Sequence, residues 1–221
     1  MIITIDGPVA SGKSAVARLL AHQRQLFYIN SGMLFRAVAY LLTEKCHLPI
    51  EQLVTLTHDQ IIQCLHVSKL NYVYQEGKEQ ILYDGENITW HLKTADMDHA
   101  ASVAGTNPDI REILLKIERK LAEYHDIVID GRDTGSVVFP EADVKIYLTA
   151  SPEIRARRWQ KDQAEKGNNF SLEETLQEIN KRDERDKTRL VAPLVKPDKA
   201  LVIDSSDKML NEIVAQIERF L

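Results

Sequence analysis

A glycine-rich segment near the N-terminus constrains this chain more than any other feature of the sequence. Residues 2–5 read Ile-Ile-Thr-Ile, a β-branched run that favours a buried strand. Residues 7–14 read Gly-Pro-Val-Ala-Ser-Gly-Lys-Ser, which matches the pattern G-x-x-x-x-G-K-S of phosphate-binding loops, and residues 15–20 have the apolar spacing of a helix. A strand, a glycine-rich loop and a helix in this order predict a loop that binds the phosphates of a nucleotide.

The residue types in this loop have physical roles in phosphate binding. Gly7 and Gly12 let the backbone curl so that successive N–H groups point at one anion, and the helix N-terminus adds partial positive charge. Lys13 can reach the terminal phosphates of a nucleoside triphosphate, and Ser14 can offer its hydroxyl to Mg²⁺. The residues expected to bind ATP here are Gly7, Pro8, Val9, Ala10, Ser11, Gly12, Lys13, Ser14 and Ala15.

The composition limits the size and the partners of the protein. The chain has 221 residues, of which 44% are hydrophobic, enough for one α/β domain with appended parts or at most two small domains. Its net charge of -5 gives no overall basic surface for nucleic acid. No apolar run is long enough to span a bilayer, and the chain enters its first strand without room for a signal peptide. A cytoplasmic protein that binds neither nucleic acid nor a membrane is therefore expected.

The cysteines and histidines give no sign of a metal site. Cys46 and Cys64 fit no metal-binding or redox spacing, so two buried free thiols are expected. The seven histidines lack the H-x-x-x-H spacing that would place two metal ligands on one helix face. A structural zinc site is therefore not expected.

Strands and helices alternate along most of the chain. Four later apolar runs are expected to form strands: residues 26–29, 127–129, 144–148 and 200–204. This alternation predicts an α/β fold with a doubly wound parallel sheet. Residues 66–92 instead alternate in steps of two and contain an Asp-Gly turn, so we expect a small antiparallel sheet inserted in the parallel frame.

An acidic residue follows one of the predicted strands. Asp130 comes directly after the run 127–129, and ligands of open α/β sheets bind at the carboxyl ends of strands. A carboxylate at this position beside a phosphate loop is where an aspartate associated with Mg²⁺ is expected. We therefore expect Mg²⁺ at Ser14, held mainly through the nucleotide phosphates, with Asp130 as a second candidate.

Two predicted helices near the C-terminus are rich in arginine. The first begins at Ser151 and carries Arg158, which is expected to contact ATP. The second carries Arg182, Asp186 and Arg189 on one face. Solvated helices with weak surface ion pairs are the ordinary alternative. The phosphate loop favours a lid that closes over bound phosphates and excludes water.

Two classes of function fit a phosphate loop in this setting, a GTPase-like switch protein and a small-molecule kinase. Residues 180–183 match the guanine-binding pattern N-K-x-D, but they lie inside a charged helix rather than after a strand. The chain also contains no Asp-x-x-Gly, the segment with which a switch senses the γ-phosphate. The kinase interpretation is favoured. No general base stands out, which suits an acceptor that is already ionised, such as a monophosphate.

Four motifs together resemble the bacterial cytidylate kinase family. They are Gly7-Pro8-x-x-Ser11-Gly12-Lys13-Ser14, Ser31-Gly32-x-x-x-Arg36, Asp130-Gly131-Arg132-Asp133-x-Gly135-x-Val137-Val138-Phe139-Pro140, and Arg182-Asp183-x-Arg185-Asp186-x-x-Arg189 with Ala192-Pro193-Leu194. The resemblance covers nearly the full length and implies transfer of the γ-phosphate of ATP to CMP or dCMP with Mg²⁺. Kinases for UMP, another nucleoside monophosphate or shikimate are alternatives, as is a non-catalytic nucleotide-binding switch.

The resemblance also implies roles for individual residues. Ser31, Gly32, Arg36 and Arg132 would lie at the acceptor phosphate; Ser102, Arg111 and Asp133 would read the cytosine; Asp186 would hold the ribose; Arg182 and Arg189 would steady the transferring phosphate. The expected catalytic residues are thus Lys13, Arg132, Arg182 and Arg189. From the residue pattern alone, Ser102 and Arg111 are expected to be solvated.

The sequence departs from the usual family pattern at a few positions. Asn30 and Phe35 stand where a small polar or acidic residue and a tyrosine are common, and Leu92-Lys93 replaces Ile-Arg. Lys93 cannot form the bidentate contact that an arginine makes. Residues 1–221 are expected to form one monomeric kinase domain with a core, an insert and a lid: core about 1–60, 94–154 and 190–221; small β insert about 61–93; lid about 155–189.

Overall fold

The structure, a computed structural model, describes residues 1–221, and contacts among them define two compact units. Unit 1 consists of Met1–Ile29 and Ala122–Leu221, and unit 2 is the intervening segment Asn30–Leu121. None of the helices combines the length and the apolar character needed to cross a membrane. The division into core, insert and lid given above stays a prediction.

A five-stranded sheet forms the centre of unit 1. Its strands are β1 (Ile2–Asp6), β2 (Phe27–Asn30), β6 (Ile127–Gly131), β7 (Val144–Thr149) and β8 (Leu201–Asp204). The order across the sheet is β2-β6-β1-β7-β8, and β1 pairs in parallel with both β6 and β7. Because the order spreads outward from β1 in both directions, the predicted doubly wound, mostly parallel sheet is confirmed.

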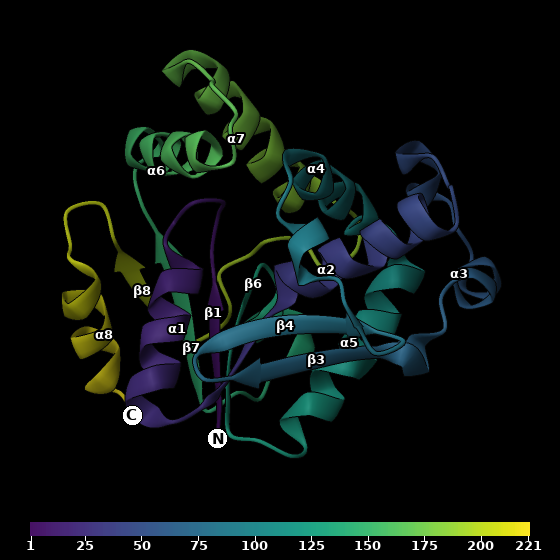
Figure 1. The fold of residues 1–221 in the computed structure, drawn as a ribbon. Coiled ribbons are helices and arrows are strands. Elements are labelled where there is room, and N and C mark those ends of the chain that lie inside the picture. The colour runs from purple at the N-terminus through teal and green to yellow at the C-terminus, as the bar shows by residue number, and fades with distance from the viewer. The chain divides into compact units, whose positions relative to one another are not determined.

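The helices of unit 1 follow its strands. They are α1 (Lys13–Arg24), the π-helical turn η5 (Thr134–Val138), α6 (Pro152–Glu165), α7 (Leu172–Thr188) and α8 (Leu210–Glu218). In Figure 1, α1 and α8 lie side by side along the sheet, and α6 packs against α7 beyond the ends of β1 and β7. Helix α6 begins at the predicted cap, because the Ser151 hydroxyl accepts a hydrogen bond from the backbone of Ile154.

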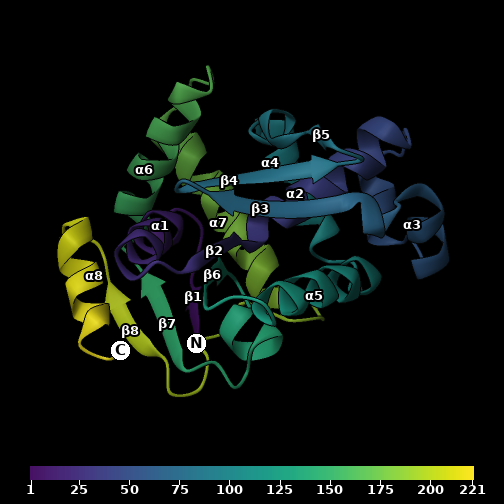
Figure 2. The ribbon, with the colours of Figure 1, turned by 60° about the horizontal axis from the view of Figure 1, so that its bottom comes forward.

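Unit 2 combines short helices with a small sheet, seen from a second direction in Figure 2. Its helical elements are α2 (Ser31–Tyr40), η1 (Leu41–Lys45), η2 (Ile50–Val54), α3 (His58–Cys64), η3 (Val67–Lys69), η4 (Thr89–Leu92), α4 (Ala95–Ala104) and α5 (Pro108–Ala122). Its strands are β3 (Leu70–Gln75), β4 (Lys78–Tyr83) and β5 (Glu86–Asn87). Asn107 caps α5, since its side-chain oxygen accepts hydrogen bonds from the backbone of Asp109 and Ile110.

The predicted antiparallel insert is confirmed, with one correction. β3 and β4 pair with Tyr72 opposite Ile81. The sheet was expected to extend to about residue 92, but its last strand is the two-residue β5, after which the chain turns into η4. The hydroxyl of Thr89 accepts a hydrogen bond from the Ile81 backbone at 2.8 Å. A side chain thereby takes the place of a further ladder carbonyl, and the strand ends.

Residues 33–44 have the apolar spacing of one helix, but the helix changes its geometry part of the way along. α2 ends at Tyr40 and continues as the π-helix η1, which begins at Leu41. Near this change the hydroxyl of Thr43 donates a hydrogen bond to the carbonyl of Ala39, a contact that often bends helices. The apolar face of the helix continues beyond this change, since Leu41 and Leu42 are buried.

The two cysteines were expected to be buried, and this prediction is wrong. Cys46 and Cys64 are free thiols, and both are half-buried. The fold of unit 2 brings them together, with the Sγ atom of Cys46 3.5 Å from the backbone oxygen of Cys64. Burial, aided by a hydrogen bond with Cys64, raises the pKa of the Cys46 thiol to about 12.

Candidate active site

The phosphate loop of unit 1 has a backbone that only glycine can follow at two positions. Gly7 has φ 153°, and a Cβ atom there would lie 2.0 Å from the backbone oxygen of Leu148. Gly12, which precedes α1, has φ 96°. L-residues rarely adopt these angles. The glycines of the motif therefore set the path of the loop between β1 and α1.

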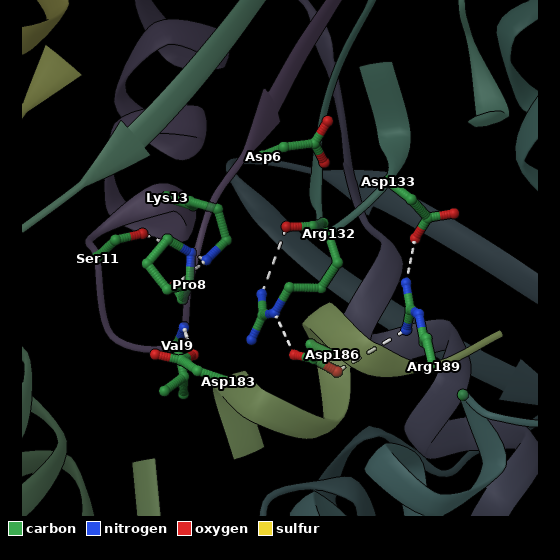
Figure 3. Close-up of polar contacts among 12 residues, drawn as sticks. Asp6, Pro8, Val9, Ser11, Lys13, Arg132, Asp133, Asp183, Asp186 and Arg189 are labelled. Atoms are coloured by element: carbon green, nitrogen blue, oxygen red, sulfur yellow. Dashed lines mark hydrogen bonds and ion pairs between the residues drawn. The ribbon is translucent and has the colours of Figure 1, made fainter. Parts of the chain in front are cut away.

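The loop leaves the N-terminus of α1 open to an anion. No side chain caps this end of the helix, and its first turn carries no acidic residue. The buried Lys13 ammonium donates to the Pro8 carbonyl at 2.7 Å and to the Ser11 hydroxyl at 3.3 Å (Figure 3). Backbone N–H groups, the helix dipole and a lysine thus meet at one place, as phosphate binding requires.

Lys13 lies in an environment that disfavours its charge. Burial, and then the positive charge of Arg132, lower its pKa well below the usual value. The carboxylates of Asp130, Asp6 and Asp183 oppose this shift. A bound phosphate chain would add negative charge and favour the ammonium form, so the site is suited to a polyanion.

The two candidate magnesium residues meet in unit 1. The hydroxyl of Ser14 donates to one oxygen of Asp130 at 3.0 Å, and the hydroxyl of Tyr28 donates to the other at 2.6 Å. Asp130 is 5% exposed, so its orientation is fixed by these partners. A hydroxyl and a carboxylate side by side are the hard oxygen ligands that Mg²⁺ prefers. The residues present therefore fit the expected metal.

Asp6 fixes the segment that follows β6. Its carboxylate accepts hydrogen bonds from the Thr134 backbone (2.8 Å), the Thr134 hydroxyl (2.8 Å) and the Gly135 backbone (2.7 Å). Burial nevertheless raises the pKa of Asp6 to about 6. Because Arg132 and Asp133 directly precede these bonded residues, Asp6 holds the backbone that presents them.

Four charged side chains form a nearly buried ion-pair network. Arg132 Nε lies 2.8 Å from Asp186, Arg189 Nη2 lies 2.9 Å from Asp133, and Arg189 Nη1 lies 3.8 Å from Asp186. Figure 3 shows Arg132 and Arg189 directed toward these carboxylates. Burial alone would raise the pKa of Asp186, but the charges of Arg132, Arg189 and Arg182 lower it overall. A solvated helix is therefore the wrong description of this part of α7 and its C-cap.

Arg158, the arginine expected to contact ATP, lies beside the phosphate loop. Its guanidinium donates to the Ser205 hydroxyl at 2.9 Å and to the Ser205 carbonyl at 2.7 Å. The Ser205 hydroxyl in turn donates to the carbonyl of Ser11 at 2.9 Å. Arg158 is thus held beside the loop through Ser205, on the segment after β8.

In unit 2, the predicted phosphate-binding Arg36 has a carboxylate partner. Its Nε and Nη2 atoms lie 2.8 Å and 2.7 Å from one oxygen of Asp98 on α4. Ser31 and Gly32 are the first residues of α2, whose cap Asn30 accepts from the backbone of Met33 at 3.0 Å. The charge of Arg36 is thus balanced by an acidic group on α4.

Arg111 was expected to be solvated, and this expectation is wrong. The residue is 8% exposed, and its Nη1 atom donates to the carbonyl of Gly105 at 3.1 Å. Its guanidinium also lies over the ring of Phe35, 5.2 Å from the centroid, as in a cation–π contact. Ser102, on α4, is half-buried. One departure from the family pattern, Phe35, therefore packs against a predicted base-reading residue.

Sequence reasoning missed several residues that organise these groups. Asp6 could have been found, because it ends a strand directly before the glycine-rich loop, just as Asp130 ends another. The others act through contacts between distant segments and carry no local signal. They are Tyr28 at Asp130, Asp98 at Arg36, Ser205 at Arg158, and Arg155 with Asp183 at the phosphate loop.

Comparison with known families and proteins agrees with the resemblance found in the motifs. The sequence profile of the family described as "Cytidylate kinase" matches residues 3–221. A relative named "Cytidylate kinase" from Carboxydothermus hydrogenoformans is 36% identical, with 98% of this chain and 95% of the relative covered. Another of this name, from Clostridioides difficile, is 34% identical, with 98% and 96% covered. The match extends over both units.

A solved structure supports the fold. The crystal structure of an uncharacterized protein from Eubacterium ventriosum matches with a TM-score of 0.55 at 13% sequence identity. The match covers 100% of this chain and 97% of the other. At this identity the likeness concerns the architecture alone.

Proposed function

Because the chain belongs to the cytidylate kinase family, we propose that it transfers the γ-phosphate of ATP to CMP or dCMP. The phosphate loop carries this proposal, since it joins a buried lysine to the uncapped start of α1. Phosphoryl transfer depends on positioning and on neutralising charge, which these groups supply. Activity as a cytoplasmic monomer belongs to the proposal and rests on the sequence alone.

The donor nucleotide is assigned to the phosphate loop and Arg158. Lys13 now donates to the carbonyl of Pro8, and it would exchange this partner for oxygens of the β- and γ-phosphates. The backbone N–H groups at the start of α1 would hold the same phosphates. Arg158 is held at the loop by Ser205 and can add a second positive charge.

Magnesium is assigned to the oxygen pair beside the loop. Ser14 would be its protein ligand, with most of the remaining coordination supplied by phosphate oxygens and water, and Asp130 is the second candidate. The bound ion would neutralise charge on the β- and γ-phosphates. Tyr28 donates to Asp130 and so fixes the orientation of this carboxylate.

The proposed reaction is a direct displacement. An oxygen of the acceptor phosphate forms a bond to the γ-phosphorus, the bond to the oxygen bridging the β- and γ-phosphates breaks, and ADP leaves. The acceptor phosphate has a second pKa near ~6, so it is ionised at neutral pH and needs no general base. Arg132, Arg182 and Arg189 would neutralise the charge shared among the three oxygens of the transferring group.

The acceptor residues are assigned within each unit. In unit 2, Arg36 with the start of α2 would hold the acceptor phosphate, while Arg111 and Ser102 would contact the base. In unit 1, Asp133 would accept a hydrogen bond from the N4 amino group of cytosine, and Asp186 would bind the ribose. The pairing of Arg36 with Asp98 and the packing of Arg111 on Phe35 support the assignments in unit 2, because both guanidinium groups are already oriented.

A substrate panel tests the proposed function. Purified protein with ATP and Mg²⁺ is supplied in turn with CMP, dCMP, UMP, AMP or shikimate, and the products are separated by chromatography. We expect CDP and dCDP to form together with ADP. Transfer to shikimate or AMP without transfer to CMP would contradict the proposal.

A further inference from the structure

Val9, in the middle of the phosphate loop, is enclosed by the two arginine-rich helices of unit 1. The residue is 6% exposed, although it lies in a loop. Its side chain belongs to a cluster with Ala156 of α6 and Ile179 of α7, and the partly buried Trp159 and Leu176 pack against this cluster. The loop therefore has an apolar attachment to both helices.

The backbone of Val9 is bound on both of its polar groups by side chains from the same two helices. Its N–H donates to Oδ1 of Asp183 at 3.0 Å, and its carbonyl accepts from Nη1 of Arg155 at 3.2 Å. The two side chains are joined to each other, because Arg155 Nη1 lies 2.5 Å from Asp183 Oδ2. Figure 3 shows the carboxylate of Asp183 beside Val9.

Stability alone does not explain this pair. Arg155 and Asp183 are 6% and 4% exposed, and a buried ion pair pays a desolvation cost that apolar residues of similar volume avoid. An apolar pair could fill the same space between α6 and α7. It could not offer one acceptor and one donor to the two polar groups of a loop residue.

The position of these contacts bears on phosphate binding. Val9 stands between Pro8, whose carbonyl accepts from Lys13, and Ala10, whose φ of 56° is costly for a residue with a side chain. Such a backbone persists only where its surroundings hold it. Arg155 is held in turn, since its Nε donates to the carbonyl of Ala150 at 3.2 Å.

We infer that Arg155 and Asp183 are positioning residues that hold the phosphate loop in its phosphate-binding conformation by binding both backbone groups of Val9. The pair acts through the loop and need not touch the nucleotide. Because Asp183 lies on α7, which also carries Arg182, the ion pair links the position of α7 to the loop that binds the donor nucleotide. The inference rests on the proposed function only in that the loop binds a nucleoside triphosphate.

Binding of a non-hydrolysable ATP analogue with Mg²⁺, measured by calorimetry without any acceptor, tests this inference. The variants are Asp183→Asn, Arg155→Lys and the apolar double variant Arg155→Met/Asp183→Leu. Asp183→Asn keeps a single acceptor oxygen for two donors, Arg155→Lys misdirects the donor to the Val9 carbonyl, and the double variant removes both contacts. Each should therefore bind the analogue about tenfold more weakly, which corresponds to the loss of about one oriented hydrogen bond. Hydrogen exchange at the Val9 amide should also become faster.

Matched controls separate positioning from general destabilisation. Glu184→Gln removes the same charge as Asp183→Asn from an exposed neighbour on α7. Ile213→Ala destabilises α8, which packs against α1 and contributes no residue to the cluster around Val9. Both should bind the analogue within twofold of the wild-type protein when measured well below every melting temperature. If Asp183→Asn does not fold, Arg155→Lys, which keeps the charge, decides the question.

Folded variants of the pair that bind within twofold of the wild-type protein would overturn the inference, whatever their melting temperatures. A purely structural role predicts that result, because it lowers stability without changing the affinity of the folded molecules. Failure of the wild-type protein itself to bind the analogue would count against the proposed function, so the two failures are distinguishable.

Discussion

The carboxylate of Asp133 lies 2.9 Å from the guanidinium of Arg189, and the two side chains are 7% and 6% exposed. The candidate reader of the base and a candidate catalytic arginine are thus paired with each other. A third charged residue takes part, because Arg189 also lies 3.8 Å from Asp186. Charged ligands can replace such internal partners without leaving a buried charge unpaired, whereas a mutation cannot.

Removal of Arg189 from this network should lower the stability of the fold. Arg189→Met leaves Asp133 without its arginine, and breaking a buried pair typically lowers the free energy of unfolding by ~3–5 kcal/mol. Urea denaturation measures the change. The control Lys187→Met removes an exposed cation two residues away and should change stability by less than about 0.5 kcal/mol. Equal stability of both variants would show that the network contributes little.

Lys13 is expected to matter for catalysis and not for folding. Lys13→Met removes a charge that burial already disfavours, so the fold should remain intact. Loss of one electrostatic contact to the transferring phosphate should lower kcat by about 100-fold or more. Turnover and melting temperature are measured together, with the exposed Lys161→Met as the control. A soluble Lys13 variant with more than half of wild-type turnover would disprove the assignment.

Asp98 is expected to orient Arg36 for the acceptor phosphate. Asp98→Asn removes the charge that holds the guanidinium at 2.7 Å, so the acceptor KM should rise by about tenfold while the KM for ATP stays the same. The matched control is Asp96→Asn, an exposed carboxylate in the same helical turn. If Asp98→Asn and Asp96→Asn have the same acceptor KM, the ion pair has no role in binding.

Asp6 should make folding stability fall as the pH rises from about 4 to about 6. Burial raises its pKa from 3.8 to about 6, so the folded protein binds this proton more tightly than the unfolded chain does. The stabilisation by the protonated carboxyl is complete below the unfolded pKa and is lost as the pH rises through the folded pKa, ~3 kcal/mol in all.

The variant Asp6→Asn lacks this titration and serves as the reference. Urea unfolding of both proteins between pH 4 and pH 7 gives the difference in their free energies of unfolding. The wild-type protein should lose stability relative to the variant across this range. A difference that does not change with pH would mean that the carboxyl of Asp6 titrates normally.

Local sequence signals were sufficient to predict the path of the phosphate loop and most of the helices and strands. Glycines at positions 7 and 12, the cap at Ser151 and the Asp-Gly turn in the small sheet each act within a few residues. Their effect on the backbone is steric or a short-range hydrogen bond, so it can be read from the sequence. The prediction that the small sheet extends to about residue 92 was wrong. The hydroxyl of Thr89 takes the place of the next ladder carbonyl, so the strand ends there.

The side-chain pairs could not be predicted in the same way. Asp6 binds Thr134 across 128 residues, and Arg155 binds Asp183 across 28. No periodicity links such positions. Arg111 is an example. Its place in the first turn of a helix predicts a solvated side chain, but the ring of Phe35 on another helix covers it. The sequence could name candidate residues, whereas the partners of these residues became visible only in the fold.

Steady-state kinetics with CMP, dCMP, UMP and AMP, on the wild-type protein and on Asp133→Ala, measure whether the enzyme selects cytosine through Asp133. A carboxylate accepts a hydrogen bond from the N4 amino group of cytosine, whereas uracil presents a carbonyl there, a mismatch that typically costs ~1–3 kcal/mol. CMP should therefore exceed UMP by at least about tenfold in kcat/KM, and Asp133→Ala should shrink this ratio by lowering the value for CMP. A wild-type protein that uses UMP or AMP as readily as CMP would contradict the proposed specificity for cytidine monophosphates.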